Sequence, residues 1–206
     1  MPTKMKLYFS KTSPYARKVR IAIEELGLGE HVEEVVADPF DPPAELLEAN
    51  PLSRVPTLIT ERGEALPDSQ LILDYLIHRK TGLATLSRGA KRWEVLRRTQ
   101  IADGVIDAAV SIVMEKRRPE SIHYIPFLDR QIATIRRSLD ALNRDAGLLA
   151  LQTPGLGEVT CGAALGYLDF RLPYLEWRKE RDALANWYTV FAQRSSMQKT
   201  APPPPG

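Results

Sequence analysis

The sequence has very few residues of the kinds that form cross-links or bind metals. It contains one cysteine, Cys161, which excludes an internal disulfide and is typical of a protein from a reducing compartment. Its three histidines, His31, His78 and His123, do not have the spacing of metal ligands, so no metal site is expected. These absences exclude a disulfide-stabilised secreted domain and a centre built on histidine and cysteine ligands.

Long apolar runs and a large excess of one charge are absent too. No apolar stretch approaches the roughly 18 residues that a membrane span needs. The first residues also lack the apolar core of a signal peptide. The formal net charge of +2 is too small to favour nucleic acid or an anionic membrane as a partner. We therefore expect a cytoplasmic protein that binds neither nucleic acid nor membranes.

Apolar periodicity divides the chain into two domains of different class. Residues 1–82 are expected to follow the order β-α-β-α-β-β-α, with strands at 6–9, 31–36, 56–60 and 65–66 and helices at 14–26, 44–49 and 68–78. Residues 90–206 are helical in pattern, with helices expected at 92–116, 126–146, 160–170 and 182–193. Gly82, Ser87 and Gly89 mark the expected linker. The fold class is therefore α/β followed by all-α.

Two serine-containing motifs in the first domain stand at expected helix starts. Ser13-Pro14 combines a favoured N-cap with a favoured first helical residue, and Asp68-Ser69 is also a good helix start, so each has a purely structural explanation. The functional interpretation is that the hydroxyl of Ser13, or that of the adjacent Thr12, stabilises a thiolate at a positive helix end. Asp68 and Ser69 would then hold the ammonium and carboxylate groups of an α-amino acid.

The Val55-Pro56 pair is the third motif of this domain. Proline lacks the N–H that a central strand needs, so it is typical of a strand start or an edge. If the bond were cis, the backbone N–H and C=O of Val55 would turn outward and could pair with the backbone of a peptide ligand. Only about 5–6% of X–Pro bonds are cis, so the sequence alone does not establish this geometry.

Taken together, the motifs resemble those of the cytosolic glutathione transferases, in particular bacterial serine-type members. The resemblance spans residues 5–200. The residues that carry it are Tyr8-Phe9-Ser10, residues 13–22 (SPYARKVRIA), Asn50-Pro51-Leu52, Arg54-Val55-Pro56-Thr57-Leu58, Asp68-Ser69 and Gly166-Tyr167-Leu168-Asp169-Phe170-Arg171. The resemblance implies a thioredoxin-like N-terminal domain that binds glutathione and an all-helical C-terminal domain with a pocket for an electrophile.

The resemblance also implies a role for each candidate site residue. Ser13, or Thr12 beside it, would contact the glutathione sulfur. Val55 with Pro56 would hold the cysteinyl backbone, Arg54 would lie near the glycyl carboxylate, and Asp68 with Ser69 would hold the γ-glutamyl group. Asp103, on the long helix of the second domain, is a candidate for the ligand's ammonium group, across a dimer. Two residues depart from the family pattern: Ser53 replaces a common glycine, and Ala163 replaces an aspartate expected to complete a capping box begun by Thr160.

The function implied is a glutathione transferase of the detoxification type, which adds the glutathione thiolate to an electrophilic small molecule without a metal. Members usually form homodimers, and the long helix from Arg92 supplies a surface for pairing. Two alternatives remain open: a non-catalytic protein-interaction module with the same fold, and a glutathione-dependent isomerase or dehalogenase. Cys161 is expected to pack in the core rather than to react.

Overall fold

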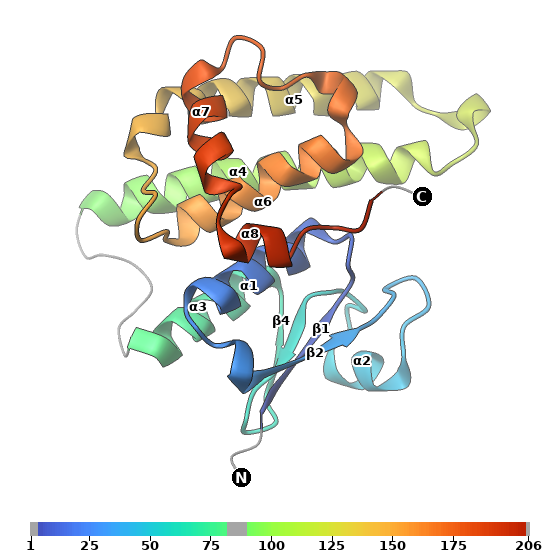
Figure 1. Cartoon of the computed structure of the whole chain (residues 1–206). Coiled ribbons are helices and arrows are strands. Elements are labelled where there is room, and N and C mark those ends of the chain that lie inside the picture. Colours follow the sequence, from blue (N-terminus) through green and yellow to red (C-terminus); the bar gives the residue numbers. More distant parts are fainter. Residues whose placement is uncertain (1–3, 82–89, 205–206) are drawn as a thin grey trace. The chain divides into compact units, whose positions relative to one another are not determined.

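The computed structural model of the chain describes residues 4–81 and 90–204. The expected linker residues Gly82, Ser87 and Gly89 lie outside these ranges. The chain forms two compact units, Met1–Ser87 with Ser195–Gly206, and Arg88–Arg194 (Figure 1).

The first unit contains a four-stranded mixed sheet in the order β2-β1-β3-β4. Its strands are β1 (Met5–Phe9), β2 (Val32–Val36), β3 (Thr57–Ile59) and β4 (Ala65–Pro67). Strand β1 runs parallel to β2 and antiparallel to β3, and β3 is antiparallel to β4. A parallel pair needs a crossover connection, and here α1 supplies it. This arrangement confirms the predicted thioredoxin-like domain.

Three helices flank this sheet: α1 (Pro14–Glu25), α2 (Ala44–Ala49) and α3 (Ser69–Thr81), with a 3₁₀ turn η1 (Gly29–His31) before β2. Helices α1 and α3 contact each other. Leu46 of α2 packs in a cluster with Tyr8 of β1 and Val55. Side chains alternate between the two faces of a strand, so Leu7 points to the face opposite Tyr8.

One short helix of the first unit was not predicted. Helix α8 (Ser195–Lys199) belongs to the expected helical domain by sequence, yet it packs on α1 of the first unit. A guanidinium nitrogen of Arg17 donates a hydrogen bond to the Met197 carbonyl at 3.1 Å, and Lys199 pairs with Glu24 at 2.7 Å. The C-terminal segment therefore groups with the thioredoxin-like unit, because its partners lie on a helix about 180 residues earlier.

The second unit is all-helical, as predicted. Its helices are α4 (Ala90–Lys116), α5 (Ile125–Arg144), α6 (Leu156–Arg171) and α7 (Asp182–Phe191), with 3₁₀ turns η2 (Glu120–Ile122), η3 (Ala146–Leu148) and η4 (Pro173–Leu175). Helix α4 packs along both α5 and α6 (Figure 1). Residues 156–168 of α6 are all buried, so this helix forms the centre of the unit. Within the described ranges, no helix has the length and hydrophobicity of a membrane span.

Helix α6 begins earlier than predicted. The Thr160 hydroxyl was expected to cap the helix, but it lies inside α6 and donates to the Leu156 carbonyl at 2.7 Å. The cap comes instead from Glu158, whose carboxylate accepts from the Gly155 and Ala150 amides at 2.9 and 3.1 Å. Threonine commonly forms such a bond inside a helix, so its presence did not mark the N-terminus.

Candidate functional site

The three predicted motifs converge at one edge of the sheet. Tyr8 of β1 lies opposite Thr57 of β3, and Thr57 lies opposite Pro67 of β4. Beyond this row, β1 continues into residues 10–13, β3 is preceded by Val55 and Pro56, and β4 continues into Asp68 and Ser69. Because β1 and β4 both run antiparallel to β3, the three segments leave the sheet at the same end. Residues as far apart in the sequence as Ser13 and Ser69 are thereby brought to the same end of the sheet.

Ser13 is the N-cap of α1. Its extended backbone (φ −76°, ψ 122°) precedes Pro14, and its hydroxyl oxygen accepts a hydrogen bond from the Ala16 amide at 3.2 Å. That contact uses a lone pair and leaves the hydroxyl hydrogen, which donates to no group within the described residues. Ser13 is half-buried, so the structure holds a hydroxyl donor at the positive end of a twelve-residue helix.

Thr12 differs from Ser13 in its hydrogen bonding. Its hydroxyl oxygen lies 3.5 Å from that of Ser10, where either group can donate. The Thr12 hydroxyl therefore shares its hydrogen-bonding capacity with a neighbour, whereas the Ser13 hydroxyl is oriented by the helix that it caps.

The Val55–Pro56 bond is cis, the geometry in which the N–H and C=O of Val55 are expected to turn outward. Val55 precedes the first paired residue of β3, Thr57, and its amide and carbonyl make no backbone hydrogen bond within residues 4–81 and 90–204. The Val55 side chain is buried against Tyr8 and Leu46. The backbone of Val55 is thus held in place by its side chain, while its polar groups are available.

Asn50 organises the loop that leads to this cis bond. It is fully buried, and its amide nitrogen donates to the Thr57 hydroxyl at 2.8 Å and to the Arg54 carbonyl at 3.2 Å. Its side-chain oxygen accepts from the Leu52 amide at 2.9 Å. Asn50 carries part of the family resemblance in the sequence, but no role was predicted for it. Its role depends on its burial, which no local sequence pattern indicates.

Ser53 and Arg54 lie in the same loop. Ser53 has φ of 50°, in the left-handed region that favours glycine, which explains why this position commonly carries glycine. The Arg54 side chain is exposed, and its carbonyl accepts from the Asn50 amide and the Thr57 hydroxyl. The departure noted in the sequence therefore affects backbone strain and leaves the loop's hydrogen bonds intact.

Asp68 and Ser69 form the start of α3. The Asp68 carboxylate accepts from the Gln70 amide at 2.8 Å, and its backbone is left-handed, with φ of 81°. Ser69 is 4% exposed, yet its hydroxyl makes no hydrogen bond within the described ranges. A strained residue beside a hydroxyl that is not engaged within the protein is typical of a ligand-binding position. The sequence predicted the helix start but carried no signal for the strain.

Asp103 lies on α4, in the second unit, and is half-buried. It has an interaction of its own within the protein. Its assignment to the ligand's ammonium group stays a prediction. Apolar side chains of the second unit differ widely in exposure: Val105 of α4 is fully buried, whereas Trp93 and Tyr124 are 69% and 65% exposed.

The described residues contain no reactive thiol and no candidate metal centre. Cys161 lies on α6 and is 1% exposed. Burial, with a smaller contribution from the charge of Glu158, raises the pKa of the Cys161 thiol. No group of three or more histidine, cysteine, aspartate or glutamate side chains in the described part of the chain is arranged to hold a metal ion.

A thioredoxin-like domain with this edge, followed by an all-helical domain, defines the glutathione transferase class of fold. Comparison with known proteins agrees with this assignment. Residues 7–83 match the glutathione S-transferase N-terminal domain, and residues 125–189 match the glutathione S-transferase C-terminal domain. The chain belongs to the glutathione S-transferase family.

Relatives match over nearly the whole chain. The uncharacterized GST-like protein YibF of Escherichia coli (strain K12) is 34% identical over 203 residues, which cover 97% of this chain and 99% of that protein. A glutathione transferase family member from Pseudomonas fluorescens Pf-5, solved with bound glutathione, is 38% identical with a TM-score of 0.91, over 97% of this chain and all of that chain. A second structure from that organism, with bound S-(propanoic acid)-glutathione, is 35% identical with a TM-score of 0.87, over 98% of this chain and all of that chain.

Proposed function

We propose that this protein is a glutathione transferase, which adds the thiolate of glutathione to an electrophilic carbon of a small molecule. The observation that carries the proposal is the convergence of Ser13, the cis Val55–Pro56 bond and Asp68-Ser69 at one sheet edge. The structural relative solved with glutathione, at 38% identity, supports the same ligand for this chain.

Each residue at this edge suits one part of the tripeptide. The amide and carbonyl of Val55 would pair with the cysteinyl backbone, because they lie outside the strand ladder. The Ser69 hydroxyl and the first amides of α3 would hold the γ-glutamyl carboxylate, and Asp68 would accept from its ammonium group. Arg54, which is exposed, would lie near the glycyl carboxylate. Asp103 would add a second acceptor for the ammonium group, from the partner subunit of a homodimer paired through α4.

Ser13 would act on the sulfur by donating its unused hydroxyl hydrogen to the thiolate. A free thiol has a pKa of about 8.5, so less than about a tenth is ionised at neutral pH. A hydrogen bond to a charged group contributes about 1.5–3 kcal/mol, which lowers the thiol pKa by roughly one to two units. The positive end of α1 acts in the same direction. Ionisation alone then raises the rate by at most about tenfold, and orientation of the two substrates supplies the rest.

The acceptors that we propose include electrophiles bearing a carboxylic acid. The ligand of the second Pseudomonas fluorescens structure carries a propanoic acid group on the glutathione sulfur, as the product of such a conjugation would. Glutathione-dependent isomerisation and dehalogenation use the same thiolate, so they are variants of this proposal. The role would be detoxification in the cytoplasm, where a lone buried cysteine stays reduced.

Calorimetric titration with glutathione, on the wild-type protein and on Ser69→Ala, tests the proposal. We expect binding in the micromolar to millimolar range that weakens about tenfold or more in the variant, because a hydrogen bond to a charged group is lost. Conjugation to a panel of electrophiles then follows by thiol consumption. If several millimolar glutathione gives no heat, the protein is not a transferase, and a protein partner should be sought by cross-linking.

A further inference from the structure

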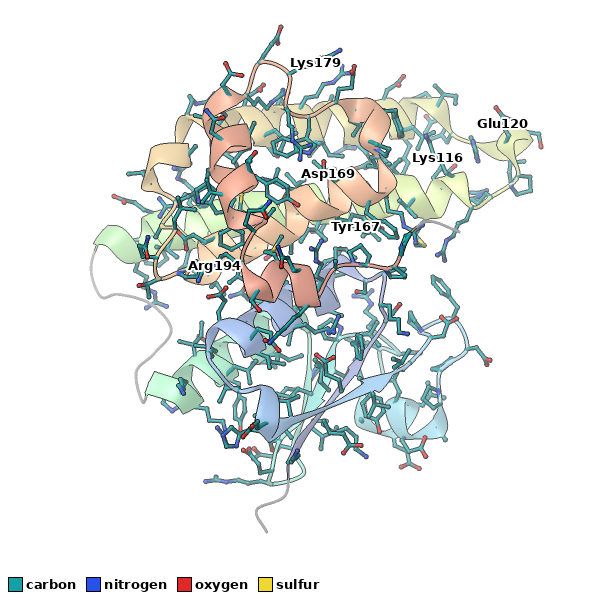
Figure 2. The ribbon with its side chains drawn as sticks, in the orientation of Figure 1. Lys116, Glu120, Tyr167, Asp169, Lys179 and Arg194 are labelled. Carbon is teal, nitrogen blue, oxygen red and sulfur yellow. The ribbon has the colours of Figure 1, made fainter. Side chains whose placement is uncertain are left out.

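The C-terminal helix α8 packs on α1, the helix that begins at the proposed sulfur-binding residue Ser13 (Figure 1). Both helices belong to the first unit, although the chain reaches α8 from the second. Arg194, which is labelled in Figure 2, is the last residue of the second unit, and α8 begins at the next residue. Five residues are too few to form a stable helix alone, so α8 depends on its contacts.

One contact of α8 lies at the first turn of α1. The Arg17 amide donates to the Ser13 carbonyl at 2.9 Å, in the backbone hydrogen bond that opens the helix. The guanidinium of the same residue donates to the Met197 carbonyl of α8 at 3.1 Å. The last carbonyls of a helix have no donor within it, and here Arg17 supplies one, together with a positive charge at the negative helix end. Arg17 therefore connects the residue that caps α1 directly with α8.

Two further contacts lie at the last turn of α1, which ends with Glu24 and Glu25. Negative charge is unfavourable there, because the helix dipole places its own negative end at the same point. Helix α8 compensates for both carboxylates: Lys199 pairs with Glu24 at 2.7 Å, and the Ser196 hydroxyl donates to Glu25. Helix α1 thus carries acidic residues at the end where a helix disfavours them, and α8 supplies their partners.

The contacts of α8 reach across most of the length of α1. Arg17 and Glu24 are seven residues apart, which is about two turns, or about 10 Å, along one face of the helix. Ser196 is buried, and the Thr200 hydroxyl donates to the Ser196 carbonyl at 2.7 Å, which secures the last turn of α8. A segment held at both ends of α1 resists tilting of this helix and fraying of its first turn.

We infer that α8 is a strap that fixes α1 in the position from which Ser13 donates to the glutathione thiolate. Arg17 and Ser196 are then positioning residues, which act through Ser13 rather than on the substrate. The inference rests on the proposed function and says how the proposed sulfur contact is held in place. A hydrogen bond weakens steeply as its length and angle depart from the optimum, so a displaced Ser13 hydroxyl stabilises the thiolate less.

The thiol pKa of bound glutathione, followed by the ultraviolet absorbance of the thiolate, tests the strap. Arg17→Met removes the donor to the Met197 carbonyl, and Ser196→Ala removes the donor to Glu25 without changing any charge. We expect each variant to raise the thiol pKa by about 0.5–1 unit, which is part of the contribution of the Ser13 hydrogen bond. Arg17→Lys keeps the charge and a donor, so its thiol pKa should lie between those of Arg17→Met and the wild-type protein.

Two controls separate a displaced helix from a damaged site. Gln198→Ala changes an exposed side chain of the same short helix and should leave the thiol pKa within about 0.2 unit of the wild-type value. S-methylglutathione has no thiol to ionise, and the residues proposed to hold its peptide, Val55, Asp68 and Ser69, lie outside α1. Its affinity, measured by calorimetry, should change less than about twofold in all the variants.

Amide hydrogen exchange of the protein without ligand tests the strap independently of glutathione. The Ala16 and Arg17 amides donate to the hydroxyl oxygen and the carbonyl of Ser13, so they report whether the first turn of α1 stays closed. Both amides should exchange about fivefold faster or more in Arg17→Met and in Ser196→Ala, and at the wild-type rate in Gln198→Ala. The amides of β1 should keep their rates, because the strap acts on α1 alone.

The outcomes distinguish the strap from the function on which it rests. A raised thiol pKa in Arg17→Met but not in Ser196→Ala overturns the strap, because the lost charge then accounts for the shift. Unchanged thiol pKa and unchanged exchange in both variants also overturn it and leave the transferase standing, provided that glutathione binds. Equal acceleration of α1 and β1 overturns it too, because the first unit is then destabilised as a whole. Failure of glutathione to bind the wild-type protein overturns the proposed function and, with it, the role of α8 in ionisation.

Discussion

The amide nitrogen of Asn50 lies 2.8 Å from the hydroxyl oxygen of Thr57, and this hydrogen bond spans the loop that contains the cis Val55–Pro56 bond. Both residues are fully buried. The backbone that would pair with glutathione is therefore held by side-chain hydrogen bonds from the interior of the domain.

Replacement of Asn50 by alanine should destabilise the first unit strongly. The variant loses three side-chain hydrogen bonds from a fully buried position, and the buried Thr57 hydroxyl keeps only its bond to the Arg54 carbonyl. We expect the free energy of unfolding to fall by about 2–4 kcal/mol, measured by urea denaturation. Asn186→Ala, at an exposed position of α7, is the matched control and should change it by less than about 0.5 kcal/mol. A similarly small effect at Asn50 would contradict this account.

Ser53→Gly should stabilise the protein. Ser53 has φ of 50°, where a side chain costs roughly 1 kcal/mol that glycine avoids. The free energy of unfolding should therefore rise by about 0.5–1 kcal/mol in denaturant titrations. The same change at Ser138, inside α5, should lower it by a similar amount, because glycine weakens a helix interior. Equal signs at the two positions would argue against strain at Ser53.

Asp68→Gly should separate stability from ligand binding. Glycine relieves the left-handed backbone at φ of 81° and is a tolerable N-cap, so the free energy of unfolding should stay within about 1 kcal/mol of the wild-type value. The carboxylate proposed to accept from the ligand's ammonium group is lost, and glutathione should bind about tenfold more weakly or worse. Thermal denaturation and calorimetry measure the two effects. Unchanged affinity would remove Asp68 from the site.

Ser13 and Thr12 can be distinguished through the ionisation of bound glutathione. Loss of a donor to the thiolate raises the thiol pKa, so Ser13→Gly should raise it by roughly one to two units, as followed by the ultraviolet absorbance of the thiolate. Glycine is preferred to alanine because it weakens the cap of α1 by only a few tenths of a kcal/mol. Thr12→Val should leave the thiol pKa nearly unchanged. The reverse pattern would assign the contact to Thr12.

Cys161 should be inert in the native protein. Its side chain is 1% exposed, and burial raises the pKa of its thiol, so the reactive thiolate is scarce at neutral pH. Iodoacetamide should label the folded chain much more slowly than the chain in denaturant, where the single cysteine reacts like a free thiol. Fast labelling of the native protein would show that α6 opens readily.

Most of the fold could be predicted because its signals are local. The strand and helix patterns of the first domain, including α2 at Ala44–Ala49, follow from apolar spacing and from proline and glycine positions. The start of α6 could not be predicted, because threonine is a residue type that often caps a helix. The group that caps α6 is the Glu158 carboxylate, and its position depends on how this side chain folds back to the Gly155 amide. Helix α8 was missed because five residues carry too little periodicity, and its partners lie on α1.

The sequence by itself determined the family and the two domain classes, and it supplied the residues proposed for the site, because helix caps, proline positions and short motifs are read residue by residue. Only the tertiary structure decided that Val55–Pro56 is cis, that Asp68 is left-handed, and that Tyr8, Thr57 and Pro67 stand in one row and bring the motifs together. Strand register and burial depend on contacts between distant segments, and no local pattern encodes them.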